Sequence, residues 1–331
     1  MNQFQYLKPL ETSVAIKSLT KDPNTHFLAG GTNLVDMMKM GLVTPHKLVD
    51  INRLPLKSIA KTSTGLHIGA LASNSEVAEH GDIKANYPLL SLAINAGASP
   101  QLRNMATVGG NLMQRTRCPY FFDLTMPCNK RLPGSGCAAL AGYNRMHALF
   151  GASDKCIAVN PSDMNVAMVA LDAVVHVSGP KGARAIKFAD FHRLPGDHPE
   201  FDNTLQKDEL ITSVELPASA TSFNKHVYYL KIRDRTSYAF ALVSVAAALH
   251  IENNAIVGAR LAMGGVAHKP WRLTTAEAFL KGKSVTEDTF KQAALIAMQG
   301  AKAYEYNQFK LKLAPNAIIQ SLKIASGLVT A

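Results

Sequence analysis

Four cysteines are the residues of this chain whose type and spacing point most directly to chemistry. Cys118, Cys128, Cys137 and Cys156 are the only cysteines among its 331 residues. They stand in a stretch rich in Pro, Gly and Arg, which favours a loop over a regular element. Four thiolates gathered on a loop are the ligand set of a tetrahedral soft-metal site or of a cubane iron–sulfur cluster. The stretch therefore predicts a metal or cluster site.

Other states of these cysteines stay open at this point. They could form two disulfides, although a chain with a large core has little need of such cross-links. They could also be free thiols. The intervening lengths of nine, eight and eighteen residues differ from a compact C-x-x-C run, so a folded loop must gather the ligands. The cations Arg115, Arg117, Lys130 and Arg131 surround the cysteines, where they could lower thiolate pKa values, offset a cluster's charge or face a partner.

Two glycine pairs, each flanked by Thr and Asn, are the second signal. Residues 29–34 (AGGTNL) follow a predicted strand and open a predicted helix, and residues 107–111 (TVGGN) repeat the pattern. Glycine permits positive φ and lacks the Cβ that would block a phosphate, while a helix start adds N–H donors. Each segment alone could be only a tight turn, but two could grip one diphosphate from opposite sides. Neither matches G-x-G-x-x-G or the P-loop.

Single charged residues carry weaker signals. Ser162 and Asp163 precede a predicted helix, where either is a common N-cap; alternatively, Asp163 could hold a ribose or an adenine. Lys231 closes a predicted strand before a run of charges that could be a solvated loop or could place a cation beside an electron-rich ring. The eleven histidines show no H-E-x-x-H spacing, which disfavours a zinc hydrolase.

Composition excludes several classes of protein. The net charge of +11 and the pI of about 9.4 suit an acidic partner, but no helix-turn-helix, zinc-finger or RNA-binding pattern is present, so we expect no nucleic acid. The sequence contains no run of 18 apolar residues, so we expect no membrane span. The first residues, MNQFQYLKP, lack the apolar stretch of a signal peptide, so we expect none on this chain.

The hydrophobic pattern predicts a mixed α/β chain interrupted by one long irregular segment. That segment, 112–160, is unusually long for a loop in a compact domain, which favours a functional role. A second domain, strands followed by helices, begins near 222. Predicted helices cover 12–21, 33–40, 89–96, 165–171, 274–280, 286–300 and 317–326, and Ser73 and Glu76 form a capping box. Predicted strands cover 25–29, 47–51, 58–61, 65–70, 173–177, 210–216, 226–232 and 256–263.

Several motifs, taken in order, resemble one known family. The stretches are AGGTNLVDMM, LRNMATVGGNL, NPSDMNVAMVALDA, LKIRDRTSYAFALVSVAAAL and MGGVAHKPWR. They are similar to the FAD-binding medium subunit of the xanthine dehydrogenase and carbon monoxide dehydrogenase family of molybdenum hydroxylases. The cysteine stretch QRTRCPYFFDLTMPCNKRLPGSGCAAL is similar to a narrower group, the flavoprotein subunits of bacterial periplasmic aldehyde oxidoreductases, which carry an additional [4Fe-4S] cluster.

The resemblance implies an α+β fold. It implies an FAD-binding domain of the vanillyl-alcohol-oxidase (PCMH) type, made of two α/β subdomains over 1–220 with the iron–sulfur insertion at about 112–160, and a small C-terminal α+β domain over 221–331. It implies one [4Fe-4S] cluster on Cys118, Cys128, Cys137 and Cys156. It carries over as FAD contacts His26, Phe27, Leu28, Ala29, Gly30, Gly31, Thr32, Asn33, Leu34, Thr107, Gly110, Asn111, Asp163, Ile211 and Lys231.

The resemblance also implies a role in a larger complex. The chain would take electrons from the [2Fe-2S] clusters of a small subunit, after a large molybdopterin subunit has oxidised an aldehyde, and pass them from FAD to an external acceptor. The alternatives are a stand-alone flavin oxidase and a flavin-less scaffold stabilised by zinc. A bacterial protein is expected, either cytoplasmic or exported to the periplasm with a signal-bearing partner.

Overall fold

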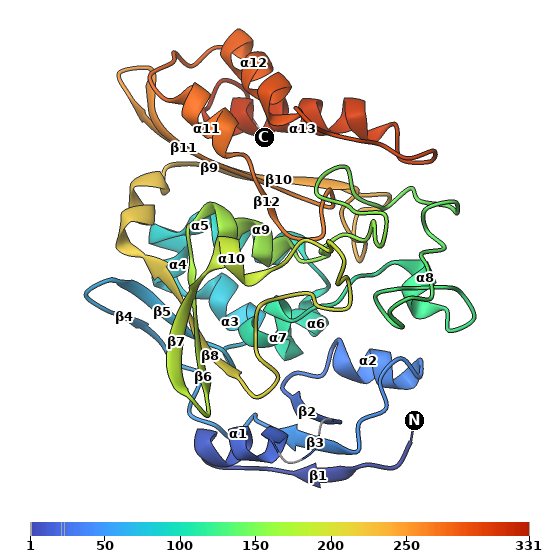
Figure 1. Ribbon diagram of the computed structural model, residues 1–331. Coiled ribbons are helices and arrows are strands. Elements are labelled where there is room, and N and C mark those ends of the chain that lie inside the picture. Colours follow the sequence, from blue (N-terminus) through green and yellow to red (C-terminus); the bar gives the residue numbers. More distant parts are fainter. Residues whose placement is uncertain (1, 21, 23, 331) are drawn as a thin grey trace.

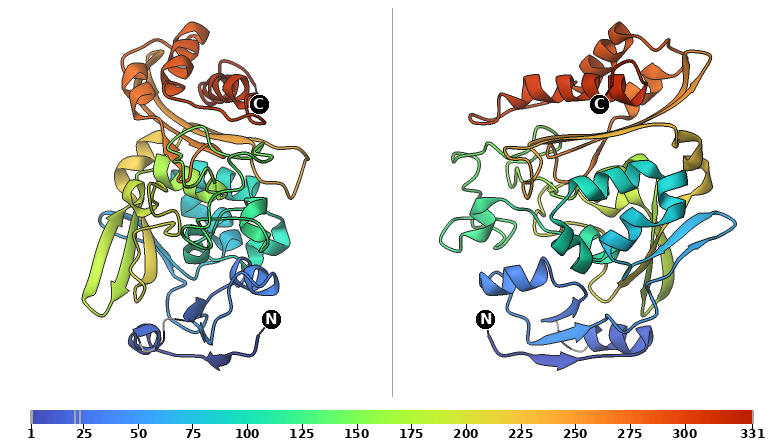
Figure 2. Two further views of the ribbon diagram at one scale, coloured as in Figure 1. Left: turned by 45° about the vertical axis from the view of Figure 1, so that its right-hand side comes forward. Right: turned by 180° about the vertical axis from the view of Figure 1, so that it is seen from behind.

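Three β-sheets lie one above another in the described part of the chain (Figure 1). The computed structural model describes residues 2–20, 22 and 24–330. The first sheet lies near the N-terminus, the second is covered by short helices, and the third carries the C-terminal helices on its outer face. The two termini therefore lie toward opposite ends of the molecule (Figure 2).

The first sheet is parallel, with strand order β1-β3-β2. Parallel strands need crossover connections: α1 connects β1 to β2, and α2 lies in the connection between the neighbours β2 and β3. Its Ala15, Ile16 and Leu19 pack with Val49 in a small core. The turn at 29–33 follows β2 at the carboxyl edge of this sheet and leads into α2. The elements are β1 (Gln5–Leu7), α1 (Thr12–Thr20), β2 (Thr25–Leu28), α2 (Leu34–Lys39) and β3 (Lys47–Asp50).

The second sheet is antiparallel, with strand order β4-β5-β8-β6-β7, and short helices cover one face. Ser73 caps the first of these helices in a capping box with Glu76, as predicted. The strands are β4 (Ile59–Lys61), β5 (Gly65–Gly69), β6 (Val174–Gly179), β7 (Gly182–Lys187) and β8 (Leu210–Pro217). The helices are α3 (Asn74–Glu79), α4 (Gly81–Asn86), α5 (Pro88–Ala96), α6 (Pro100–Met105), α7 (Val108–Leu112), α9 (Asp163–Ala170) and α10 (Phe188–Phe191).

The third sheet, ordered β12-β11-β10-β9, is covered on both faces. Helices α5 and α9 pack beneath it, and α11 and α13 pack above it. Strand β10 is buried from Val243 to Leu249 and is apolar there except at Ser244, because neither side of this stretch meets water. The elements are a 3₁₀ helix (Ala218–Phe223), β9 (His226–Ile232), β10 (Val243–Glu252), β11 (Ala255–Gly264), β12 (Trp271–Arg272), α11 (Thr274–Leu280), α12 (Glu287–Ala297) and α13 (Lys310–Ala325).

The cysteine segment between α7 and α9 is irregular, as predicted, apart from the short α8 (Pro119–Phe122). It lies at one side of the molecule, between α2 and the third sheet (Figures 1 and 2). Phe121 and Cys128 are buried against Met37 of α2. The segment is thus anchored by apolar contacts as well as by hydrogen bonds.

Some details differ from the sequence prediction. Residues 107–111 were expected to be a turn, but residues 108–111 belong to the helix α7, which Thr107 caps by accepting a hydrogen bond from the Gly110 N–H. Helix α6, which the sequence did not predict, starts at Pro100, because the first N–H of a helix has no partner within the helix and proline lacks that N–H. Helix α13 begins seven residues before the predicted start at 317, because Pro315 within its first turns argued against a helix there. Residue 21, the last of the predicted first helix, lies outside the described residues.

Among the described residues, none of the helices combines the length and the apolar character that a membrane span requires.

Phe290 tests the core of the C-terminal helices. It is fully buried in α12, whereas Leu295 on the same helix is 70% exposed. We expect Phe290→Ala to lower the free energy of unfolding by about 3–5 kcal/mol, since it removes a large buried ring and leaves a cavity. Leu295→Ala should change it by less than about 0.5 kcal/mol. Urea unfolding of both variants measures this, and equal effects would contradict the assigned core.

Candidate functional site

A cleft of about 1010 Å³ opens between the first sheet, the short helices and the third sheet. It is lined by Gly30, Gly31 and Thr32 from the first glycine segment, and by Gly110 and Asn111 from the second. The structure thus brings the two glycine segments to one cleft, as the sequence predicted. Asp163, Lys231 and the loop 234–241 line its other side.

The glycines of the first segment are required by close packing and by backbone conformation. A Cβ at Gly30 would lie 1.8 Å from the carbonyl oxygen of Met105, so only glycine allows the turn to touch the chain just before α7. Gly31 has φ +73°, which favours glycine on its own account. Its Cβ would meet the side chains of Val35 and Leu28. We expected these glycines to leave space for a phosphate, but close backbone packing at Gly30 and the positive φ at Gly31 already require glycine.

The second segment presents Gly110 and Asn111 to the cleft, while Thr107 is turned inward as a cap. A Cβ at Gly110 would meet only the hydroxyl of Thr107, at 3.0 Å. Asn111 Oδ1 accepts hydrogen bonds from Ser162 Oγ (2.5 Å) and Gln114 Nε2 (2.7 Å). The side-chain oxygen of Asn111 thereby ties the second glycine segment to the start of α9.

Asp163 and Lys231 form a buried ion pair at the side of the cleft. Lys231 Nζ donates to Asp163 Oδ2 over 2.7 Å, and the two side chains are 4% and 8% exposed. The Tyr229 hydroxyl donates to the other oxygen, Asp163 Oδ1, over 2.8 Å. Burial, with the Asp163 charge, raises the pKa of Tyr229 well above its usual value. Sequence reasoning missed Tyr229; its position two residues before Lys231, on the same face of β9, was the available signal.

Other predicted contacts lie behind the cleft wall. His26, Phe27 and Leu28 belong to β2, with Ala29 directly after it. Leu34 starts α2 and packs against the cysteine segment. Ile211, in β8, is buried in the core of the second sheet and is absent from the cleft lining. Asn33 Oδ1 accepts a hydrogen bond from the Arg115 N–H, and its Nδ2 is buried without a partner within the described chain.

The four cysteines line one small pocket. The backbones of Cys128 and Cys137 form an isolated antiparallel β-bridge. None of the four thiols forms a disulfide. Burial raises the pKa of the Cys118 thiol to about 12 and that of Cys156 to about 11, so these two thiols are neutral at pH 7. Metal binding here would release protons. Within the described residues, no three His, Cys, Asp or Glu side chains lie close enough to hold a single metal ion.

The cysteine pocket adjoins the cleft. Thr116 and Cys118 line both. His147 also lines the cleft, and its Nε2 lies 3.1 Å from the sulfur of Cys118. Burial lowers the pKa of His147 to about 4, so its ring is neutral at pH 7. The irregular segment therefore builds part of the cleft wall.

Two family matches cover most of the chain. The FAD binding domain of molybdopterin dehydrogenases matches residues 2–219, and the C-terminal domain of the CO dehydrogenase flavoprotein matches residues 228–308. The chain is 48% identical over 325 residues to PaoB, the aldehyde oxidoreductase FAD-binding subunit of Escherichia coli (strain K12), covering 97% of this chain and 98% of that protein. This chain belongs to the family of FAD-binding subunits of molybdopterin dehydrogenases.

More distant relatives agree. The glyceraldehyde dehydrogenase medium chain of Sulfolobus acidocaldarius is 30% identical over 88% of this chain and 86% of its own length. The solved structure of carbon monoxide dehydrogenase from Hydrogenophaga pseudoflava superposes with a TM-score of 0.77 at 24% identity, covering 98% of both chains. The expected α+β fold, a family FAD-binding domain followed by a smaller C-terminal domain, is confirmed, and the chain is an oxidoreductase subunit.

The cleft of this FAD-binding subunit fits its cofactor. Its volume is at the upper end of the roughly 300–1,000 Å³ typical of ligand sites. Three polar atoms on its lining residues, Asn74 Oδ1, Arg117 Nε and His147 Nδ1, are buried without a partner in the described structure. Arg103, Arg117 and Lys39 line the side near the glycine segments, which suits a diphosphate.

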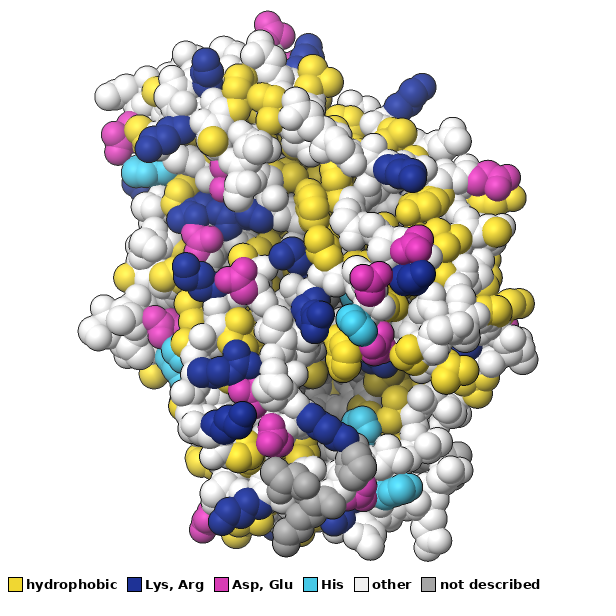
Figure 3. Space-filling model, viewed as in Figure 1, with side chains coloured by type: hydrophobic (Ala, Val, Ile, Leu, Met, Phe, Trp, Pro, Cys, Tyr) yellow, Lys and Arg dark blue, Asp and Glu magenta, His cyan; other side chains and the backbone are white. Residues whose placement is uncertain are grey.

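Charge on the outer surface is mixed. In the described part of the face in Figure 3, Lys and Arg side chains are interspersed with Asp and Glu. On this face the Lys and Arg side chains thus do not gather into one basic patch. This face gives no particular support to a polyanion as partner.

The buried pair at Asp163 generates a stability prediction. Asp163→Asn should lower the free energy of unfolding by about 3–5 kcal/mol, because it leaves the Lys231 ammonium buried without its anion. Asp234 is the matched control, since it lines the same cleft but is 55% exposed in its pair with Arg145. Asp234→Asn should cost less than about 1 kcal/mol. Urea unfolding of the flavin-free chain checks both, and similar costs would refute the assigned difference.

Proposed function

We propose that this chain is the FAD-binding electron-transfer subunit of an aldehyde-oxidising molybdenum hydroxylase. The observation that carries the proposal is the cleft on which both glycine segments meet. The 48% identity to an aldehyde oxidoreductase subunit, extending over nearly the full length of both chains, supports an aldehyde as the substrate of the complex.

In this proposal each side of the cleft has its own task. The N–H groups near Gly31 and Gly110, with Arg117, hold the diphosphate of FAD. Asp163 and Lys231, fixed to one another and to Tyr229, orient the part of the cofactor on the opposite side. Bound FAD supplies exchange between single-electron and two-electron carriers. Thr107 and residues 26–29, which the resemblance also assigns to FAD, do not line the cleft and would act by positioning the glycine segments.

The partners proposed are a large molybdopterin subunit, which oxidises the aldehyde, and a small [2Fe-2S] subunit, which delivers electrons to this chain. We also propose a boundary near residue 220, between the FAD-binding domain and the C-terminal domain, which the gap between the two family matches supports. A bacterial complex, cytoplasmic or exported with a signal-bearing partner, accords with the Escherichia coli relative.

We propose one [4Fe-4S] cluster on Cys118, Cys128, Cys137 and Cys156. Three observations support it: four thiols line one pocket, they are free, and the surrounding stretch resembles the cluster-bearing group. A single tetrahedral zinc ion needs sulfurs about 3.8 Å apart. A cubane binds each cysteine to a different iron and so accepts a wider set of sulfurs, which fits four thiols that share a pocket without closing around one ion.

Gly110 tests FAD binding. Gly110→Val places a branched side chain in the cleft with only the Thr107 hydroxyl in its way, so the fold should survive. We expect the dissociation constant of FAD to rise at least tenfold, about 1.4 kcal/mol. Gly81→Val is the control. Gly81 is exposed, like Gly110, and lies in the first turn of a helix, and no atom lies near the position of its absent Cβ. Unlike Gly110, it lies outside the cleft lining. Unchanged FAD affinity in Gly110→Val would place the cofactor elsewhere.

Metal analysis tests the cluster. We expect about four iron and four sulfide per chain. Cys128→Ser should lose both and leave residues 112–160 sensitive to protease, because bound metal orders a loop that lacks its own regular structure. Leu132→Ala, a change at a 64% exposed residue of the same segment, should keep the metal. One zinc per chain without sulfide would show a structural zinc site instead.

A further inference from the structure

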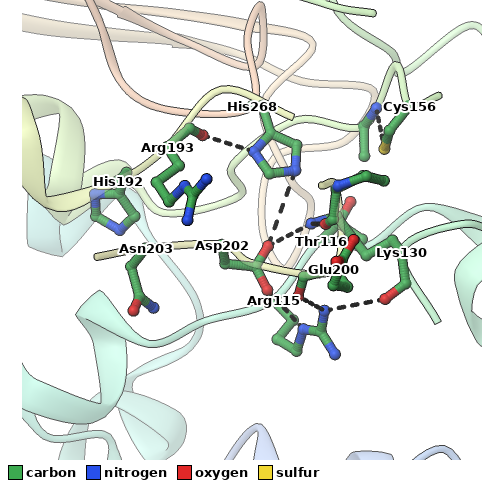
Figure 4. Close-up of polar contacts among 12 residues, drawn as sticks. Arg115, Thr116, Lys130, Cys156, His192, Arg193, Glu200, Asp202, Asn203 and His268 are labelled. Carbon is green, nitrogen blue, oxygen red and sulfur yellow. Dashed lines mark hydrogen bonds and ion pairs between the residues drawn. The ribbon is translucent and has the colours of Figure 1, made fainter. Parts of the chain in front are cut away.

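One carboxylate, that of Asp202, connects two of the cysteine-bearing stretches. Asp202 Oδ2 accepts a hydrogen bond from Arg115 Nε over 2.7 Å, and Oδ1 accepts one from Lys130 Nζ over 2.6 Å (Figure 4). Arg115 stands three residues before Cys118, and Lys130 stands two residues after Cys128. These cysteines are separated in the chain, so the carboxylate fixes their distance through its two cations.

The backbone around Asp202 strengthens this attachment. Lys130 Nζ also donates to the Pro199 carbonyl over 2.7 Å, and Arg115 Nη2 donates to the Glu200 carbonyl over 3.1 Å. The Asp202 carbonyl in turn accepts a hydrogen bond from the Arg193 N–H over 3.0 Å. Residues 193–202 thus form a fixed support, outside the cysteine segment, against which Cys118 and Cys128 are held.

The other two cysteines are joined to Cys128 by its neighbour Asn129. Asn129 Oδ1 accepts a hydrogen bond from the Gly136 N–H, beside Cys137, over 2.8 Å. Its Nδ2 donates to the carbonyl of Lys155, beside Cys156, over 3.0 Å. Asn129 and Asp202 together therefore fix all four cysteine stretches relative to one another before any metal is bound.

Burial gives the Lys130 charge an effect beyond packing. Its side chain is 1% exposed and lines the cysteine pocket, whereas that of Asp202 is 19% exposed and does not belong to the pocket lining. Charges act over longer distances where water is excluded. The cation therefore lies nearer to the pocket than its anion does, and the pair presents its positive end to the cysteines.

We propose that Asp202 is a positioning residue of the cysteine site, and that the Lys130–Asp202 pair sets the reduction potential of the cluster held there. The inference rests on the proposed [4Fe-4S] cluster. A bound cluster gains a negative charge on reduction, so a nearby cation favours the reduced form and a nearby anion opposes it.

The two halves of the pair should act with opposite signs. In the FAD-loaded chain, Lys130→Gln removes the cation and shifts the cluster's midpoint potential downward. Asp202→Asn removes the anion and shifts it upward, and the double variant shifts it less than either single change. Asp154→Asn is the control, because Asp154 lies in the same segment with its side chain 77% exposed; it should leave the potential unchanged. Redox titration followed by optical and EPR spectra gives these values.

A second measurement separates positioning from the potential. Without metal, Asp202→Asn should expose the cysteine segment to protease and speed thiol labelling several-fold over the control, while Asp202→Glu restores protection. Shifts of the same sign in Lys130→Gln and Asp202→Asn, or none, would overturn the tuning role, and unchanged protease and labelling rates would overturn positioning. If Asp202→Asn does not fold, Lys130→Gln and the double variant decide the sign. A wild-type chain without iron and sulfide would overturn the proposed cluster, and positioning would be judged on the metal-free readouts.

Discussion

The contact between Gly30 and the Met105 carbonyl is the constraint on which the cleft depends. A Cβ at position 30 would lie 1.8 Å from that oxygen, so a larger residue would push the first sheet away from the helical layer. The contact works because β2 delivers its turn at the carboxyl edge of a parallel sheet, directly beside the chain that enters α7. Two glycine segments some 75 residues apart in sequence thereby come to face one cofactor cleft.

Buried charge fixes the remaining walls. Asp163 on α9 and Lys231 on β9 join the helical layer to the third sheet, and Asp202 joins the support at 193–202 to the cysteine segment. Burial alone would raise the pKa of Asp202, but Lys130 and Arg115 lower it to about 2, so this carboxylate stays ionised at neutral pH. Buried ion pairs add little net stability because of their desolvation cost. Their value here is geometric: Asp163 adds a fixed polar contact to the apolar core that α9 and the third sheet share, and Asp202 fixes the cysteine segment to residues 193–202.

The sequence allowed most elements to be predicted, because caps, turns and alternation are local signals. The capping box at Ser73 and strand β9 are present as predicted. The prediction of a turn at residues 107–111 was wrong, because two glycines suggest a turn whereas Thr107 supplies a helix cap that only the structure reveals. Tyr229 and Asp202 were missed for a different reason. Their partners lie 66 and 72 residues away, and no local pattern encodes such long-range pairs.

The adjacency of the two pockets changes how the cysteine segment should be understood. From sequence, it could be an insertion beside an independent FAD site, because both glycine segments lie outside it. In the structure, Thr116, Arg117, Cys118 and His147 all line the cleft. His147 contacts the Cys118 sulfur, and its ring is neutral at pH 7, so it offers the sulfur a hydrogen-bonding group and no charge. Order in the segment and shape of the cleft are therefore linked through Cys118, and a group bound by the cysteines would lie against the wall of the flavin site.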